Sequence, residues 1–330
     1  MQGEPFSAKG KQIMLKEKGF FKGVNLGGWL SQCDYSTERM DTFITETDFR
    51  QIAAWGFDHV RIPIDYNVIQ NEDGTMREDG LARLDGALTL CEKYGLNTVL
   101  DLHKTQGFSF DSKEHEDGFF ESTAQQEKFY AIWECFAARY GSRHEHVLFE
   151  LLNEVTLQEY LEPWKRISRE CVRRIHAIAP EVYVLLGSYH WNSAKTLPEL
   201  DAPYDDHVLY NFHFYEPHEF THQGAYWMDA GFDKERRLSY AESGVSEAWF
   251  EDFLAPAFEK ARKEGTELYC GEYGVIDVVP PEEALKWFRD LSAVFARHGV
   301  ARSLWSYKQM DFGLSDARMD TVRNELLELL

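Results

Sequence analysis

The run HVLFELLNE at positions 146–154 joins a short apolar strand pattern to a carboxylate at its end, Glu154. A second run, ELYCGE at positions 267–272, has the same form and ends at Glu272. Carboxylates at the carboxyl ends of parallel strands face the mouth of an α/β barrel, where barrel enzymes keep their reacting groups. Two such carboxylates that converge on one point are what the cleavage of a glycosidic bond requires. The pair therefore indicates both a fold and a class of chemistry.

Outward from these two runs, short apolar or β-branched segments alternate with longer helical patterns along the whole chain. We predict strands at residues 21–25, 58–63, 97–103, 146–154, 182–187, 207–213, 267–272 and 300–307. We predict helices at residues 46–55, 79–94, 122–140, 161–178 and 247–264, a further helix opened by Pro280-Pro281, and a closing helix at 319–330. Strands that alternate with helices favour a parallel sheet. Eight such units predict an α/β fold, a (β/α)8 TIM barrel that forms one domain over residues 1–330.

Two connections of the predicted barrel are unusually long. They are residues 104–121 after strand three and residues 216–246 after strand six, the second rich in Tyr, Trp, Gly and charge. Loops of this length are usually functional. Because both follow strand ends, we expect both to overhang the same mouth of the barrel.

Composition excludes several classes of partner. The formal net charge is −21, which disfavours nucleic acid and anionic membrane surfaces. No run reaches the roughly twenty apolar residues that a membrane span needs. The start, MQGEP, lacks the apolar core of a signal peptide, so we expect a cytoplasmic protein, or a secreted one if a leader has been removed. Five cysteines, an odd number without metal-type spacing, are typical of buried thiols rather than disulfides.

Further polar and aromatic residues stand where the predicted strands end. They are Arg61, His103, Asn153, His213, Tyr215 and Trp305. Each has a structural explanation when taken alone: a helix cap, a buried ion pair, a hydrogen-bonded histidine or a core tryptophan. Parallel strands, however, bring their carboxyl ends to one rim, so these side chains and the two glutamates would share one cleft. Their shared location favours an active site.

These eight residues, in this order and each on its expected strand, resemble the hallmark set of glycoside hydrolase family 5, the large cellulase family. The resemblance runs from GVNLGGW at positions 23–29 to strand eight, and the Gly-Gly-Trp also resembles exo-β-1,3-glucanases of the family. It implies hydrolysis with retention of configuration. Glu154 would be the general acid and then the general base, and Glu272 the nucleophile.

The resemblance also implies roles for the neighbouring residues. Arg61 and Tyr215 are expected beside Glu272, where a cation and a phenol donor keep it ionised. The charge of Glu272 should in turn raise the pKa of Glu154, and His213 should orient the two.

Substrate contacts are expected around this pair. Asn153 is suited to bond the sugar 2-hydroxyl, His103 another hydroxyl of the same ring, and Trp305 offers a flat face beneath it. Further residues expected to line the subsites are Asn25, Trp29, Trp227, Lys308 and Asp311, and further aromatic candidates are Phe108, Trp191, Tyr226 and Trp249. Glu150 and Asp101 are expected to point into the barrel as structural polar groups.

No cofactor or metal is expected, because the pairs His218/His222 and His144/His146 lack a third ligand at a recognisable spacing. Two segments depart from the family pattern. The 216–246 region looks shorter than in endo-acting relatives, and Lys104-Thr105-Gln106 stands where many relatives carry His-Ala-Pro. Both lie on the cleft rim, so they affect substrate preference rather than mechanism.

The sequence leaves several functions open. The first is an endo-acting β-glucanase on β-1,4 or mixed β-1,3-1,4 linkages, with a β-linked glucan as partner and a monomeric enzyme. Its enzymatic alternatives are an exo-β-1,3-glucanase and a β-mannanase. A non-catalytic carbohydrate-binding protein is the alternative of another class, but it would have no reason to keep both carboxylates in a low-dielectric cleft.

Overall fold

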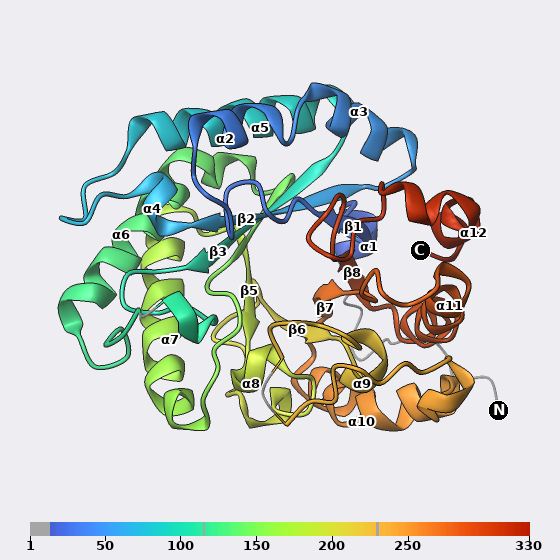
Figure 1. Cartoon of the computed structure of the whole chain (residues 1–330). Coiled ribbons are helices and arrows are strands. Elements are labelled where there is room, and N and C mark those ends of the chain that lie inside the picture. Colours follow the sequence, from blue (N-terminus) through green and yellow to red (C-terminus); the bar gives the residue numbers. More distant parts are fainter. Residues whose placement is uncertain (1–13, 115, 229–230) are drawn as a thin grey trace.

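The eight predicted strands close into one parallel barrel. The structure is a computed structural model that describes residues 14–114, 116–228 and 231–330. The strands are β1 Lys22–Asn25, β2 His59–Asp65, β3 Asn97–Lys104, β4 Val147–Glu150, β5 Tyr183–Gly187, β6 Val208–Phe214, β7 Leu268–Tyr273 and β8 Ala301–Leu304. Each strand pairs with its neighbour in sequence, and β1 pairs with β8, all in parallel (Figure 1). The predicted (β/α)8 barrel is confirmed.

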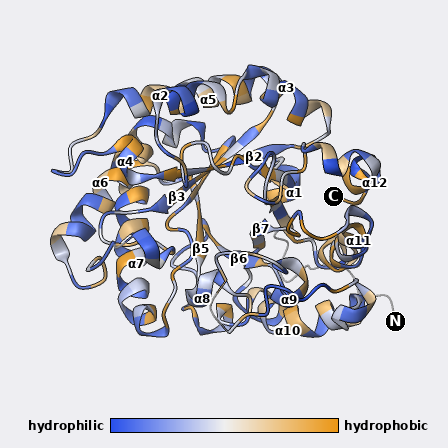
Figure 2. Ribbon diagram, viewed as in Figure 1, coloured by the Kyte–Doolittle hydropathy of each residue, from blue (hydrophilic) through white to orange (hydrophobic). Residues whose placement is uncertain are grey.

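Long helices surround this barrel. They are α3 Glu46–Ala54, α5 Glu78–Tyr94, α6 Thr123–Tyr140, α7 Leu161–Ile178, α10 Glu247–Glu264, α11 Pro281–His298 and α12 Arg323–Leu329. Their apolar residues turn towards the strands (Figure 2). Trp133, Trp164 and Trp287 are fully buried at this helix–strand layer. The expected helices are confirmed, apart from the tail, where a 3-10 turn at Ala317–Thr321 precedes α12.

Local signals set the ends of these helices. The Ser122 and Ser246 side chains accept hydrogen bonds from the backbone N–H three residues later and so cap α6 and α10. Gly265 and Gly299 end α10 and α11 with φ of 68° and 66°, a left-handed conformation that glycine adopts at little cost.

The fifth unit differs from the prediction of eight strand–helix units. Between β5 and β6 the chain forms only the short turns α8 Tyr189–Asn192 and the 3-10 turn Leu197–Glu199. Other short helices that periodicity could not reveal are α1 Met14–Glu17, α2 Thr37–Thr42, α4 Tyr66–Ile69 and α9 His218–Thr221. Four to six residues are too few to show a helical period.

The two long connections lie as predicted, after β3 and β6, with residues 115 and 229–230 outside the described residues. Phe110 of the first connection packs edge-on against His103 at 5.1 Å between ring centroids. No helix in the described ranges is long and apolar enough to cross a membrane. All five cysteines are free thiols.

Candidate active site

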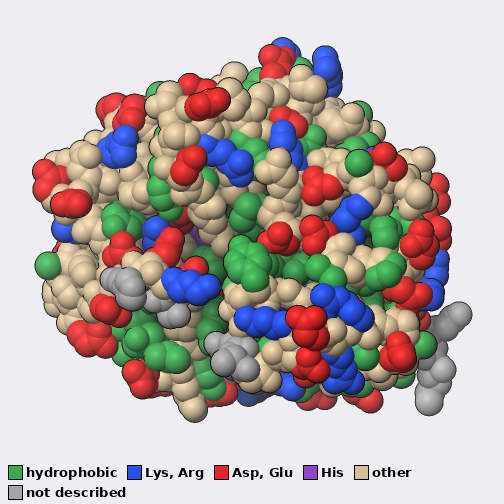
Figure 3. Space-filling view, in the orientation of Figure 1, with side chains coloured by type: hydrophobic (Ala, Val, Ile, Leu, Met, Phe, Trp, Pro, Cys, Tyr) green, Lys and Arg blue, Asp and Glu red, His purple; other side chains and the backbone are tan. Residues whose placement is uncertain are grey.

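Strand register brings the polar residues of the barrel together. Asn25 pairs with Arg61 across β1 and β2, and His213 pairs with Glu272 across β6 and β7. Asp101 and Glu150 pair across β3 and β4. Neighbours in register on parallel strands point to the same side, so these side chains meet inside the barrel near its mouth. A hollow with a histidine inside it is visible near the middle of this face (Figure 3).

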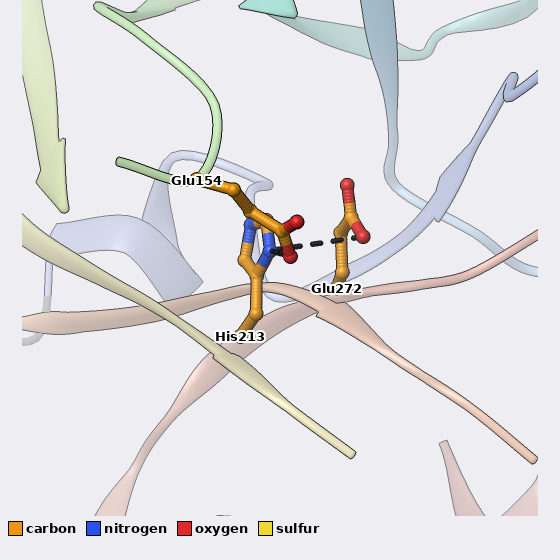
Figure 4. Close-up of side chains that lie close together, drawn as sticks. All are labelled: Glu154, His213 and Glu272. Carbon is orange, nitrogen blue, oxygen red and sulfur yellow. Dashed lines mark hydrogen bonds and ion pairs between the residues drawn. The ribbon is translucent and has the colours of Figure 1, made fainter. Parts of the chain in front are cut away.

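The carboxylates of Glu154 and Glu272 lie side by side next to the ring of His213 (Figure 4). An oxygen of each carboxylate and a ring nitrogen of His213 lie within 4.8 Å of one another. Glu272 lies within β7, whereas β4 ends at Glu150 and Glu154 follows in a loop. Its φ of 41° is unusual for a residue other than glycine, and such strained conformations gather at functional sites. Carboxylates this close are compatible with the nucleophile and the acid/base of a retaining glycosidase, which lie about 5–5.5 Å apart, and not with the wider spacing of an inverting one.

Glu272 is buried among groups that favour its charged form. Arg61 Nη1 donates to its Oε1 at 2.8 Å, and the Tyr215 hydroxyl donates to its Oε2 at 2.9 Å. Burial alone would raise the pKa of Glu272, but His213 and then Arg61 outweigh it, and the pKa is lowered. The predicted positions of Arg61 and Tyr215 are confirmed.

Glu154 has the opposite balance. Its Oε1 lies 2.8 Å from His213 Nδ1. Burial raises the pKa of Glu154, and the charge of Glu272 adds to the rise although His213 opposes it. The predicted influence of Glu272 is present, but burial is the larger cause. The two carboxyl groups therefore prefer different protonation states at one pH.

His213 lies close to both glutamates, where it can act as the predicted orienting residue. Its Nδ1 is 3.7 Å from Glu272 Oε2, and its Nε2 is 3.8 Å from Glu150 Oε1. Burial lowers the pKa of His213, but the charge of Glu272, the nearby carboxylate of Glu150 and the bond to Glu154 raise it to about 10. The spacing of Glu154, His213 and Glu272 would also suit a metal ion. A protonated imidazole has no lone pair to offer, however, and Arg61 already places a positive charge at Glu272.

Arg61 is a fully buried cation that joins three carboxylates. Its Nε and Nη2 bond both oxygens of Glu150 at 2.7 Å, and Nη2 lies 3.0 Å from Asp101. Its Nη1 donates to Glu272 and Asn25, and Nη2 also reaches Asn153. The predicted inward direction of Glu150 and Asp101 is confirmed.

Replacing Arg61 with Met should destabilise the protein by about 3–5 kcal/mol, because it leaves buried carboxylates without a counter-charge. Urea unfolding measures this loss. The matched control is Arg173→Met, which breaks a largely exposed pair with Glu170 and should change stability little. Equal, small changes in both variants would contradict the central role of Arg61 in the barrel.

Asn153 and His103 complete the floor of the site. Asn153 accepts from Arg61 through Oδ1, while its buried Nδ2 has no hydrogen-bond partner among the residues that the structure describes. His103 Nδ1 lies 2.7 Å from Asp101, and its ring stacks on Trp305 at 5.8 Å and 2°. Asn153 thus offers a spare donor, and the stacked His103 and Trp305 rings offer a flat aromatic face.

Three residues that were predicted to contact substrate bond to other residues of the protein instead. Asn25 is fully buried, and its amide bonds Gly271 and strand β8. Trp29 is core, because its Nε1 donates to Met40 and its ring packs on Phe49. Lys308 donates to the carbonyl of Phe43 and to Asp48. These residues hold the barrel and its first loop in place.

The remaining candidates are spread over the rim. Trp227 is half-buried and, like Tyr215, packs near His222 and Phe312. Asp311 has a left-handed φ of 60°, and its carbonyl accepts from the backbone of Asp277. Among the further aromatics, Phe108 is buried and Trp249 packs on Phe250 and Phe253, whereas Trp191 and Tyr226 are exposed.

Two residues near His103 were missed by the sequence analysis. Gln32 Oε1 lies 3.2 Å from His103 Nε2, and Phe110 packs on the same ring. Neither carries a sequence signal: Gln32 comes from an irregular loop with a left-handed φ of 49°, and Phe110 stands among several loop aromatics. Both contacts depend on how the loops fold over β2 and β3.

Comparison with known proteins assigns the family. A family model described as cellulase (glycosyl hydrolase family 5) matches residues 16–311. The chain belongs to glycoside hydrolase family 5. It is 56% identical over 289 residues to cellodextrinase A of Ruminococcus flavefaciens, in an alignment that covers 88% of this chain and 86% of that protein. It is 37% identical over 337 residues to endoglucanase C of Acetivibrio thermocellus, which covers 94% and 98%.

The fold of this family 5 protein is also that of solved structures. Cel5A of Thermotoga maritima, solved with cellobiose, aligns with a TM-score of 0.81 at 23% identity, covering 96% of this chain and 99% of that one. The same protein has been solved with mannotriose. The family is retaining. The protein is therefore a glycoside hydrolase of retaining type.

Proposed function

We propose that this enzyme is an endo-acting β-glucanase that cleaves β-1,4 or mixed β-1,3-1,4 linkages by double displacement. The observation that carries the proposal is the pair Glu154 and Glu272, whose oxygens lie within 4.8 Å of each other and whose pKa values are shifted in opposite directions. A protonated acid and an ionised nucleophile on either side of one acetal bond are what the first step needs.

In the first step the carboxylate of Glu272 attacks the anomeric carbon. The bond from that carbon to the leaving oxygen breaks, and Glu154 gives its proton to that oxygen, which departs as a free hydroxyl. The product is a glycosyl ester on Glu272. Arg61 and Tyr215, at 2.8 and 2.9 Å, keep the attacking carboxylate ionised and aimed.

In the second step water replaces the ester. Once Glu272 is glycosylated its negative charge is gone, so the charge that helped raise the pKa of Glu154 is also gone. Glu154, left ionised when it gave up its proton, stays ionised and takes a proton from water, whose oxygen attacks the anomeric carbon. Glu272 leaves as a carboxylate, and the configuration is retained because it has been inverted twice.

The floor of the site supplies substrate contacts for this reaction. The spare Nδ2 donor of Asn153 is suited to the 2-hydroxyl of the sugar that reacts, a bond that strengthens in the transition state. Trp305 provides an apolar face, and His103, stacked on it, is suited to a second hydroxyl.

The preference for β-glucan rests on the relatives. A cellodextrinase and an endoglucanase, each matched over most of its length, support β-1,4-linked glucose chains as the substrate class. The higher identity to the cellodextrinase supports soluble cello-oligosaccharides among the substrates. The strongly acidic surface suits a neutral polymer.

A product time course tests this proposal. The enzyme is incubated with barley β-glucan, carboxymethylcellulose, glucomannan and laminarin, and early products are separated by size. We expect oligosaccharides of mixed length from the first two, since an endo enzyme cuts inside the chain. Glucose alone from laminarin would support the exo-β-1,3-glucanase alternative, and preferential cleavage of glucomannan the mannanase. No new reducing ends from any polymer would end the proposal.

A further inference from the structure

Glu150 is a buried carboxylate that the reaction itself does not use. It is the last residue of β4, four positions before Glu154, and almost no solvent reaches it. Its carboxylate accepts two bonds from Arg61 at 2.7 Å and one from Asn211 Nδ2 at 2.8 Å. His213 Nε2 lies 3.8 Å away. A buried anion with this many donors is held in one position.

The two cationic partners of Glu150 are the groups that contact the reacting pair. Arg61 donates to Glu272 at 2.8 Å, and His213 bonds Glu154 at 2.8 Å. Glu150 is therefore linked to the nucleophile Glu272 through Arg61, and to the acid Glu154 through His213. Asp101, the other buried carboxylate on Arg61, contacts His103 instead of His213.

We propose that Glu150 is a positioning residue that holds Arg61 in place and keeps His213 charged and in place, and thereby sets the pH range in which Glu154 and Glu272 can react. The proposal rests on the function proposed above for those two glutamates. It assigns Glu150 no contact with substrate.

The charges around Glu150 agree with this role. Burial raises the pKa of Glu150, but Arg61 and then His213 lower it to about 2, so Glu150 is ionised at any working pH. The charged groups that face His213 are Glu150 from β4, Glu154 from the loop after it and Glu272 from β7. Arg61 forms ion pairs with Asp101 and Glu272 in addition to Glu150.

Removal of the Glu150 charge has two opposite effects on the reacting pair. Directly, one fewer negative charge nearby lowers the pKa of both Glu154 and Glu272. Indirectly, His213 loses one of the three carboxylates that raise its pKa to about 10, and we expect its pKa to fall into the active pH range. A neutral His213 no longer lowers the pKa of either glutamate, so both pKa values rise. His213 is in direct contact with Glu154 and is the largest charge effect on Glu272, so the indirect effect should win.

The pH profile of kcat/KM on a cello-oligosaccharide tests the proposal with two variants. Glu150→Gln keeps the shape of the side chain but removes its charge. Both limbs of the bell-shaped pH profile of this variant should move to higher pH by about one unit. Its kcat should also fall by about 10–100-fold, as is typical when an orienting partner is lost. Glu150→Asp keeps the charge, so it should lower kcat while its limbs stay within a few tenths of a unit. If the two limbs of the pH profile of Glu150→Gln do not shift, or shift to lower pH, the proposal is wrong.

Asn211→Ser is the matched control, because it removes a bond to Glu150 without removing a charge. It should leave both limbs in place. If native enzyme hydrolyses no glucan, the proposed function fails. If native enzyme is active and the limbs do not respond to the charge at position 150, only the role of Glu150 fails.

A second measurement does not depend on how well Glu150→Gln folds. The ring of His213 can be followed by NMR titration of the native enzyme, with its signal assigned by its loss in His213→Gln. The proposal requires His213 to stay protonated across the active pH range. A neutral His213 in that range would contradict it.

Discussion

Glu272→Gln should abolish turnover of both β-glucan and activated aryl cellobiosides, with kcat lower by about 10⁵-fold or more. An amide is a poor nucleophile, and neither a good leaving group nor an intact Glu154 replaces the missing attack. The variant should remain folded, because the amide oxygen can still accept from Arg61 or Tyr215, which now hold the carboxylate. Steady-state rates on both substrate types, with thermal unfolding as a check, measure the effect.

The rescue of a smaller variant separates a lost nucleophile from a damaged site. Glu272→Gly opens space in which azide can attack the anomeric carbon of an aryl β-glycoside. The expected product is a glycosyl azide of inverted anomeric configuration, since only one displacement occurs. Near-native hydrolysis by Glu272→Gln, or azide products with retained configuration, would show that Glu272 is not the nucleophile.

Glu154→Gln should have an effect that depends on the leaving group. Hydrolysis of glucan should fall by about 10²–10⁴-fold, the usual contribution of a positioned proton donor. Glycosylation by a dinitrophenyl cellobioside needs no such proton, so it should remain fast. Deglycosylation should be slow because the general base is missing, so we expect a burst of phenol and then a slow steady state. The limb of the pH profile due to loss of the acid proton should vanish.

Glu159→Gln is the control for Glu154→Gln, since Glu159 is an exposed carboxylate five residues along the same loop region. It should keep native rates on both substrates. Equal losses by Glu154→Gln on glucan and on the activated glycoside would argue against an acid/base role and for a purely structural one.

The barrel and its reacting pair could be predicted because their signals are local. Apolar strand patterns and the carboxylates that follow them are readable without knowledge of the partner strands. Strand four was predicted to continue to Glu154, but β4 ends at Glu150. Leu151 and Leu152 extend the apolar pattern although they no longer belong to the strand. Periodicity also could not reveal that Glu154 adopts a left-handed φ.

Contacts between segments far apart in the sequence could not be predicted. Asn25 and Trp29 have residue types that suit a sugar site, but the fold turns them towards Gly271 and Phe49. Gln32 and Phe110 reach His103 only because two irregular loops meet over it. Such contacts are set by tertiary packing, which a single sequence pattern does not encode.

Trapping of the covalent intermediate tests the central claim most directly. The native enzyme is treated with a 2-deoxy-2-fluoro-β-cellobiosyl fluoride. The 2-fluorine slows both steps, whereas the good leaving group speeds only the first, so the glycosyl ester accumulates. Peptide mass spectrometry should then find one cellobiosyl ester, on the peptide that contains Glu272 and at that side chain. An ester on another residue, or hydrolysis of glucan with inverted configuration and no ester, would contradict the mechanism.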